Sequence, residues 1–196
     1  DHLNEGKSVR ELQIEDDEKA MVKDLHLLTD KPVLYVCNVD EESVVEGNQY
    51  VENLKSAVKD EEAEVIVVAA GVEAEIAELE TKEERQMFLD DIGLKESGLT
   101  RMIRAAYKLL DLNTFFTAGP KEVRAWTVKK GSTAPEAGSV IHSDFQRGFI
   151  KAEVIKYEDF IKYKSESACR EAGKINLEGK NYIVKDGDLM NFKFNV

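Results

Sequence analysis

The sequence predicts two structural units, an α/β unit over residues 1–112 and an α+β unit over residues 113–196. Two continuous apolar runs, at residues 33–37 and 64–70, are typical of strands covered on both faces of a parallel sheet. A helical pattern at residues 49–60 lies between them, which gives the strand–helix–strand order of a parallel pair with a right-handed crossover. After residue 112 the pattern changes to short strands separated by turn signals.

The N-terminal segment predicts a helix over residues 8–28. Met21, Leu25 and Leu28 recur at helical spacing, so one apolar stripe is expected on an otherwise charged helix. Pro32 follows and ends the helical pattern. The chain begins without methionine, in the middle of this charged stretch, and we therefore expect it to be a piece of a longer protein.

Two further helices are predicted before the boundary near residue 112. The first covers residues 83–92 and ends at Gly93. The second covers residues 98–110, and its expected apolar face consists of Leu99, Met102, Ile103, Ala106 and Leu110.

The second unit is expected to hold a small mixed sheet with one or two helices. Strands are predicted at residues 114–117, 122–128 and 152–157, and helices at residues 158–163 and 167–172. A closing hairpin is predicted from residues 182–185 and 189–194 around Asp186-Gly187-Asp188. The expected core is Phe115, Val123, Ala125, Val154, Ile183, Leu189, Phe192 and Phe194.

Composition narrows the class of protein. The net charge of −12 argues against nonspecific coating of nucleic acid, so DNA is not an expected partner. Two cysteines cannot form a disulfide framework, no apolar run approaches a membrane span and no secretory signal is visible, so a cytoplasmic protein without a membrane partner is expected.

A local basic face in the second unit would be needed for contact with RNA. Arg124 and Lys151 are candidates for one such sheet face, and a mixed solvated surface is an equally good explanation. The basic residues of this unit that we considered are Lys121, Arg124, Lys129, Lys130, Arg147, Lys151, Lys156, Lys162 and Lys164.

The pattern that carries chemistry is Asn38-Val39-Asp40-Glu41, directly after the first buried strand. Open α/β sheets bind ligands beyond the carboxyl ends of their strands, and an Asn amide followed three residues later by a carboxylate can read a base. A turn followed by an acidic helix start is the alternative explanation. The small residues Ala69-Ala70-Gly71 end the next strand and would let backbone N–H groups approach a ring, so the two loops together predict a nucleotide-base pocket.

Two other patterns have structural explanations. His142, Ser143 and Asp144 are adjacent and cannot converge as a catalytic triad, so turn or capping roles are expected. Trp126 is expected in the core, with an exposed stacking platform for RNA as the alternative. No catalytic residue and no metal ligand is expected in this chain.

These segments resemble the YchF subfamily of Obg-like P-loop NTPases. The resemblance covers essentially the whole chain, and the matching segments are KPVLYVCNVDE (31–41), AGVEAEIAEL (70–79), YKLL (107–110), TFFTAG (114–119), KEVRAW (121–126), HSDF (142–145), GFI (148–150) and KDGD (185–188). It implies that residues 1–28 end a helical coiled-coil insert, that the rest of 1–112 is the C-terminal part of the NTPase domain, and that 113–196 is a TGS domain of β-grasp fold.

The resemblance further implies a cytosolic, ribosome-associated ATPase that prefers ATP to GTP. The base of the bound nucleotide would contact Asn38, Val39 and Glu41 in one loop and Ala69, Ala70 and Gly71 in the other. Glu41 replaces the Asp of the Asn-Lys-x-Asp pattern that selects guanine, and a non-catalytic binding module or a GTPase are the alternatives.

The phosphate-binding sequence Gly-x-x-x-x-Gly-Lys-Ser/Thr does not occur. The phosphate cradle and the Mg²⁺ ligands are therefore expected upstream of Asp1, and the chain alone is not expected to hydrolyse nucleotide.

Overall fold

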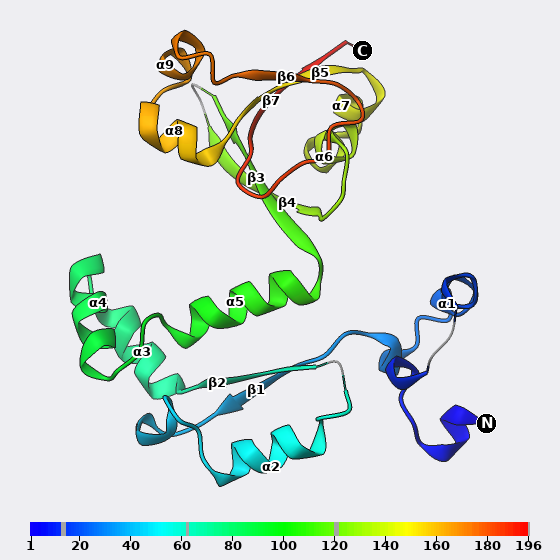
Figure 1. Ribbon diagram of the computed structural model, residues 1–196, viewed down its shortest axis with the longest axis vertical. Coiled ribbons are helices and arrows are strands. Elements are labelled where there is room, and N and C mark those ends of the chain that lie inside the picture. The colour runs from blue at the N-terminus through cyan, green and yellow to red at the C-terminus, as the bar shows by residue number, and fades with distance from the viewer. Residues whose placement is uncertain (13–14, 62, 120–121, 196) are drawn as a thin grey trace. The chain divides into compact units, whose positions relative to one another are not determined.

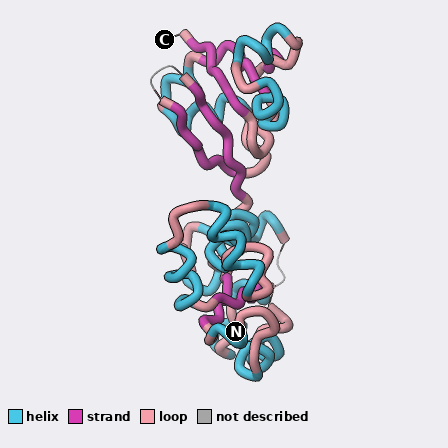
Figure 2. The backbone as a smooth tube through the Cα atoms, turned by 90° about the vertical axis from the view of Figure 1, so that its left-hand side faces the viewer, coloured by secondary structure: helices cyan, strands magenta, loops and turns pink. Residues whose placement is uncertain are grey.

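The computed structural model describes residues 1–12, 15–61, 63–119 and 122–195. The chain forms two compact units, Asp1–Leu109 and Leu110–Val196. Helices predominate in the first, whereas a larger sheet organises the second (Figures 1 and 2). No helix of the described residues has the length and apolar character needed to cross a membrane.

The first unit contains a strand pair, five α-helices and short 3-10 turns among its described residues. The strands are β1 (Leu34–Asn38) and β2 (Glu64–Val68). The α-helices are α1 (Asp16–Lys23), α2 (Gln49–Ala57), α3 (Ala70–Glu78), α4 (Lys82–Asp91) and α5 (Gly98–Leu109). The 3-10 turns are η1 (His2–Glu5), η2 (Val9–Glu11), η3 (Leu28–Asp30) and η4 (Glu41–Ser43).

The predicted strand–helix–strand arrangement is confirmed, because β1 and β2 pair in parallel with α2 between them in sequence. Helix α2 begins where Asn48 Oδ1 accepts hydrogen bonds from the N–H groups of Tyr50 and Val51. Helix α4 begins at a capping box formed by Thr81 and Glu84, which fixes its start one residue before the prediction.

The long N-terminal helix was a wrong prediction. Only α1 is α-helical there, and His26 has a positive φ of 48°, which an α-helix cannot continue through. Met21, Leu25 and Leu28 are all exposed, so the expected apolar stripe packs against nothing in the described structure. Their helical spacing therefore has no packing consequence among the described residues.

Helix α3 was missed, and the second predicted strand ends at Val68 rather than at residue 70. The segment from Ala70 is rich in Ala and Glu, which favour helix, and it therefore leaves the sheet at once. Its buried Val72 and Ile76 join Val44, Ala69, Leu89 and Leu94 in the hydrophobic cluster of this unit.

Helix α5 was predicted in the right place, but its buried face was not. Leu99, Ile103 and Leu110 are exposed, whereas Gly98 and Ala105 are buried. A Cβ on Gly98 would lie 2.8 Å from Val68 Cγ1, so α5 approaches β2 through its small residues.

The second unit is a five-stranded sheet with two helices associated with each face. Its strands are β3 (Leu112–Ala118), β4 (Val123–Lys129), β5 (Phe149–Ile155), β6 (Asn176–Glu178) and β7 (Leu189–Phe194). Its helices are α6 (Ala134–Ile141), α7 (Ser143–Arg147), α8 (Tyr157–Tyr163) and α9 (Glu166–Glu171).

The sheet order is β4-β3-β7-β5-β6, with β7 parallel to β3 and antiparallel to β5. Helices α6 and α7 contribute to the main core on one face, where Phe192 packs edge-on against Phe115, Phe145 and Phe149. Helices α8 and α9 contribute to a smaller cluster on the other face, built around Ile155, Cys169 and Leu189.

The closing hairpin was a wrong prediction. Residues 182–185 form no strand: Ile183 makes an isolated bridge with Thr133, and Val184 N–H donates to the Ser132 carbonyl. Gly187, with φ of 82°, provides the expected turn, but its N–H donates to the Thr114 carbonyl on β3. The turn therefore connects this segment to the neighbouring strand instead of folding it back on β7.

Half of the predicted core of this unit is correct. Phe115, Val154, Leu189 and Phe192 are buried. Val123, Ala125, Ile183 and Phe194 are exposed, because the inward residues of β4 are Trp126 and Val128 and the inward residue of the 182–185 segment is Val184. The errors at Val123, Ala125 and Ile183 concern which of two neighbouring residues points inward, since a shift of one residue reverses every side chain. Phe194 lies on the core side and stacks on Phe145, but it is the last residue of β7 and stays partly exposed.

Candidate functional site

The predicted base-reading residues lie at the shared carboxyl edge of β1 and β2. Asn38 is the last residue of β1 and lies opposite Val68, the last residue of β2. Asn38 Oδ1 accepts a 3.0 Å hydrogen bond from the Ala70 N–H, and the Val39 N–H donates to the Val68 carbonyl at 2.8 Å. The structure therefore brings together the two loops that the sequence singled out, through a direct bond between them.

Donor groups at this edge remain available. Asn38 is exposed, and within the described residues its Nδ2 group has no hydrogen-bond partner. Gly71 is the second residue of α3, and its N–H also has no partner in the described part of the chain. Two donors thus lie beside the Asn38–Ala70 bond: the Nδ2 group of Asn38 itself and the N–H of Gly71, one residue after Ala70.

The members of the second loop differ in burial. Ala69 belongs to the hydrophobic cluster and is 2% exposed, whereas Ala70 and Gly71 are exposed. A Cβ at Gly71 would meet no atom within 4 Å. Ala69 therefore anchors this loop, and Ala70 and Gly71 form its accessible surface.

The loop after β1 is shaped by Asp40, which the sequence analysis did not assign a role. Asp40 Oδ1 accepts a 2.9 Å hydrogen bond from the Ser43 N–H and begins the 3-10 turn η4. Hydrogen bonding from Ser43 lowers the pKa of the Asp40 carboxyl. The spacing of Asp40 and Ser43 is the ordinary capping signal that could have identified it.

Val39 and Glu41 occupy different environments in the same loop. Val39 is half-buried and packs against the cluster that contains Val44 and Ala69. Glu41 is exposed, and its carboxylate makes no ion pair or hydrogen bond to the residues that the structure describes. Glu41 thus presents an exposed carboxylate, without a partner among the described residues, in the loop that follows Asn38.

The basic residues chosen in the second unit do not form one surface. Arg124 pairs with Thr117 on the face that carries Phe115 and Trp126, while Lys151 pairs with Lys193 on the opposite face. The prediction of a shared Arg124–Lys151 face was therefore wrong. A register shift between Phe149 and Lys151 reverses the side-chain alternation of β5, which the sequence pattern does not reveal. Lys121 lies outside the described residues.

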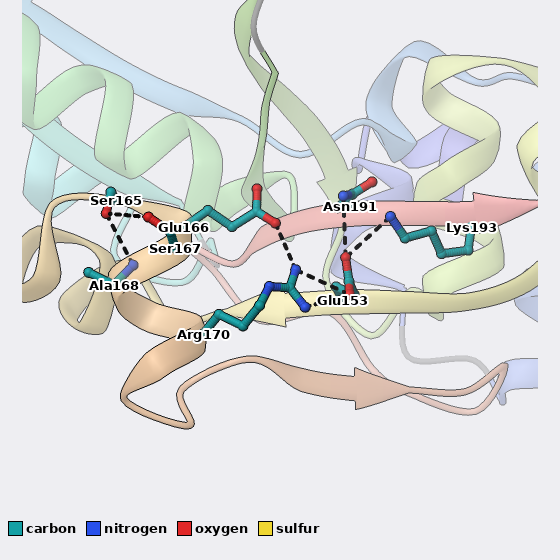
Figure 3. A network of polar contacts seen from close by, with 8 residues as sticks. All are labelled: Glu153, Ser165, Glu166, Ser167, Ala168, Arg170, Asn191 and Lys193. Carbon is teal, nitrogen blue, oxygen red and sulfur yellow. Dashed lines mark hydrogen bonds and ion pairs between the residues drawn. The ribbon is translucent and has the colours of Figure 1, made fainter.

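Positive charge on the Lys151 face is partly compensated by Glu153 (Figure 3). Its carboxylate contacts Arg170 at 3.3 Å and Lys193 at 3.2 Å, and accepts a hydrogen bond from Asn191. Burial by itself would raise the pKa of Glu153, but the hydrogen bonds and charges of Arg170 and Lys193 outweigh it and lower the pKa.

The remaining sequence candidates have structural roles. His142 Nδ1 accepts from the Asp144 N–H at the start of α7, as expected for a capping residue. Trp126 is half-buried against the main core; its Nε1–H donates to Thr117 Oγ1, and the Arg124 guanidinium covers its ring at 4.1 Å. Among the described residues, no group of His, Cys, Asp or Glu is arranged to hold a metal ion.

The first unit has an α/β fold with two bonded loops at the carboxyl ends of a parallel strand pair. Proteins of this fold class bind their ligands at that place.

The family model YchF-GTPase_C, described as a protein of unknown function (DUF933), matches residues 112–195. The chain is 53% identical over 192 residues to the ribosome-binding ATPase YchF of Bacillus subtilis, covering 97% of this chain and 52% of that protein. It is 52% identical over 194 residues to the protein of the same name from Escherichia coli O157:H7, with coverage of 99% and 53%.

Solved structures agree with these similarities. The Schizosaccharomyces pombe YchF GTPase structure matches with a TM-score of 0.83 and 34% identity, covering 98% of this chain and 51% of that one. A GTP-binding protein from Pyrococcus horikoshii OT3 matches with a TM-score of 0.58 and 16% identity, covering 93% and 57%, which concerns the fold alone. The chain belongs to the YchF family, and it spans about half the length of the relatives that it matches.

Proposed function

We propose that this chain supplies the base-recognition half of a cytoplasmic, ribosome-associated ATPase. The observation that carries the proposal is the Asn38 Oδ1–Ala70 N–H bond, which holds the two strand-end loops together. The names of the bacterial relatives, ribosome-binding ATPases, support the ribosome and ATP assignments.

Base recognition would use groups that the fold leaves free. A purine ring has nitrogen acceptors, which the Asn38 amide and the Gly71 N–H can satisfy as donors. Exposed Ala70 and Gly71 let the ring approach the backbone closely. Val39 and Ala69 would form the floor of the site through their packing in the hydrophobic cluster.

Selection of ATP over GTP would depend on Glu41. A shorter Asp at this position accepts from the two donors on the guanine edge in Asn-Lys-x-Asp proteins. Glu41 is one methylene longer, lies on the 3-10 turn set by Asp40 and is not held against another residue in the described structure. The resulting loss of a fixed guanine contact would favour adenine, although the S. pombe relative is named a GTPase.

The phosphates and Mg²⁺ would be bound by the remainder of the protein. The chain contains no Gly-x-x-x-x-Gly-Lys-Ser/Thr sequence, and the described residues hold no metal-binding cluster. We therefore assign no catalytic residue to this chain and do not expect it to hydrolyse nucleotide by itself.

The second unit would be a TGS domain of β-grasp type, and residues 1–28 would be the end of a coiled-coil insert. A mixed five-stranded sheet with a central β7 supports the β-grasp assignment. RNA contact through this unit would have to use either the Arg124 face or the Lys151 face. Separate Arg124→Glu and Lys151→Glu variants of the full-length protein, followed by ribosome co-sedimentation at increasing salt, would identify the face used.

The test of the base site is ATP titration of the full-length protein carrying substitutions at Asn38. Asn38→Ala should weaken ATP binding by about 1–3 kcal/mol, because the base loses a hydrogen-bond donor and one of its acceptors is left unsatisfied in the complex. Asn38→Asp keeps the acceptor for the Ala70 N–H but replaces the amide donor with a charged oxygen, so it should also weaken binding while the loops stay joined. Asn53→Ala, on the exposed surface of α2, is the matched control. Unchanged ATP affinity in both Asn38 variants would refute the assignment.

A further inference from the structure

The outer edge of β2 is unpaired in the described structure. β1 and β2 form a two-stranded sheet, and the Val68 carbonyl accepts from Val39 on the β1 side. In a parallel strand, consecutive residues direct their backbone groups to opposite sides, so Val65 and Val67 direct theirs away from β1. Val67 carbonyl oxygen accepts from Arg101 Nη2 at 2.9 Å, which leaves the N–H and carbonyl of Val65 as the central free groups of this edge.

A groove of about 410 Å³ runs along this edge. Residues of β2 line it together with Ala105 of α5 and with Val44 and Val45 from the segment after η4. Because consecutive residues of β2 all contribute, the groove follows the backbone of the strand and not one face of the sheet. Its shape therefore suits an extended chain.

The groove is rich in positive charge. Lys55, Arg101, Arg104 and Lys108 line it, against Glu46 and Glu64. Arg104 is paired with Glu96 at 2.7 Å and Lys108 with Glu64 at 3.6 Å, but both basic side chains are largely exposed, so a ligand carboxylate can compete with these partners.

Arg101 gives a second, independent indication of an anionic ligand. Its Nη2 contacts only a backbone carbonyl, and no ion pair with an acidic side chain is found for it in the described residues. Its Nε–H is buried and, within the same residues, has no hydrogen-bond acceptor. Arg101 also lines the groove, and a guanidinium whose charge no described acidic side chain neutralises is suited, beside a free strand edge, to a carboxylate carried by a strand.

We propose that this groove binds an extended acidic peptide segment, which adds to β2 as a third strand. Backbone bonds to Val65 would provide the attachment, and carboxylates on alternate residues would meet Arg101, Arg104 and Lys108. A nucleic-acid backbone offers the negative charge but not the alternating N–H and C=O groups of a strand. This site is separate from the proposed base site, which lies beyond the carboxyl end of the same strand.

The test uses the full-length protein and a labelled hexapeptide of alternating Val and Glu, followed by fluorescence anisotropy. Saturable binding is expected, and replacing Glu with Lys in the peptide should abolish it. A version N-methylated on alternate residues keeps the charge but cannot donate to the strand edge, so it should bind at least roughly tenfold more weakly if backbone bonds of ordinary strength are lost.

Protein variants then locate the site. Arg104→Glu and Lys108→Glu should each weaken peptide binding roughly three- to tenfold, as expected for reversing an exposed charge. Glu96→Gln, which frees Arg104, should strengthen it, and Lys82→Glu at the start of α4 is the control with the same charge change elsewhere. Hydrogen exchange at residues 64–68 should slow when the peptide is bound.

Several results would overturn the proposal. They are the absence of saturable binding, equal binding of the N-methylated peptide, or equal losses in Arg104→Glu and Lys82→Glu. A single-stranded RNA that displaces the peptide and responds to the same variants would assign the groove to nucleic acid instead. ATP affinity should be the same in all these variants, so failure here is distinguishable from failure of the nucleotide proposal.

Discussion

Lys156 Nζ lies 2.6 Å from Asp188 Oδ1, and the Asp188 side chain has no exposed surface. The Tyr182 hydroxyl and the Lys185 N–H both donate to the other carboxylate oxygen, at 2.7 and 2.9 Å. Lys156 also donates to the Tyr182 hydroxyl at 2.6 Å. Burial lowers the pKa of Lys156, but its bonds to Asp188 and Tyr182 outweigh this and raise it. This network holds residues 182–188 in a loop and explains why they do not form a hairpin.

Removal of the cation from this network should destabilise the second unit. Lys156→Met leaves the buried Asp188 carboxylate without its counter-ion, and we expect a loss of about 3–5 kcal/mol in the free energy of unfolding. Asp188→Asn should cost less, because the neutral amide has the same size and leaves no buried charge, although only one of its two terminal atoms can still accept a hydrogen bond. Urea unfolding followed by fluorescence of Trp126, the one tryptophan of the sequence, reports on this unit. Lys180→Met on the exposed surface is the control, and equal midpoints for the two Lys variants would contradict the prediction.

Acid should destabilise the second unit partly through Glu153. Its folded-state pKa is lowered by Arg170 and Lys193, so its stabilising contribution is complete above the unfolded-state pKa and is lost as pH falls through the folded one. Glu153→Gln removes this contribution at every pH. The difference between wild type and variant should therefore be largest near neutral pH and shrink below about pH 4, the ordinary range of a glutamate. A difference that stays constant across urea titrations at several pH values would show that the ion pairs do not stabilise the fold.

The nucleotide preference should respond to the length of the side chain at position 41. Glu41→Asp in the full-length protein should raise GTP affinity relative to ATP, because the shorter carboxylate can accept from both guanine donors. Combining it with Val39→Lys restores Asn-Lys-x-Asp but removes a half-buried side chain from the cluster with Val44, so the single variant is the cleaner test. Competition between labelled ATP and GTP measures the ratio. If ATP preference is as strong as in wild type, loop shape and not the carboxylate selects the base.

A methyl group at position 148 should disrupt one end of the five-stranded sheet in the second unit. A Cβ on Gly148 would overlap the backbone carbonyl of Asn195, and the Asn195 N–H donates to the Gly148 carbonyl at 2.9 Å. Gly148→Ala should therefore cost about 1–3 kcal/mol of stability, as overpacking typically does. Gly179→Ala, where a Cβ would meet no atom within 4 Å, is the matched control. Thermal unfolding that is equal in the two variants would be inconsistent with this contact.

The second unit should fold by itself. Residues 110–196 form a compact unit with their own core around Phe115, Val154 and Phe192, and a domain of this length is marginal but ordinary. The isolated fragment should give a cooperative unfolding transition and bind no nucleotide, because Asn38 and Ala70 lie outside it. Nucleotide binding by the fragment would contradict the proposal that the base site lies in the first unit.

The sequence was sufficient for features that depend on local patterns. The parallel pair β1–β2 follows from two continuous apolar runs, and the site loops follow from their position at the ends of those runs. It was not sufficient for the face that each element buries. Helix α5 packs on β2 through Gly98 and Ala105 because close approach favours small residues, although Leu99 and Ile103 make the more apolar face.

Two polar features of the second unit were also beyond the sequence pattern. Asp188 belongs to a turn motif in sequence, and only the fold brings Lys156, 32 residues earlier, to within bonding distance. Lys151 and Arg124 alternate as expected within their own strands, but the register shift in β5 decides which face Lys151 occupies. Both depend on contacts between distant segments, for which local residue preferences carry no information.

The strand in the middle of the second sheet is also the last one to be synthesised. β7 lies between β3 and β5, although its residues, Leu189–Phe194, follow those of all four other strands. Until it leaves the ribosome, β3–β4 and β5–β6 are two separate strand pairs, and such pairs are marginally stable in water. Phe192, which packs against Phe115, Phe145 and Phe149, arrives with β7. This unit therefore completes its core in one late step, after β7 has been translated. Until then the edges of β3 and β5 that will pair with β7 stay open to other chains.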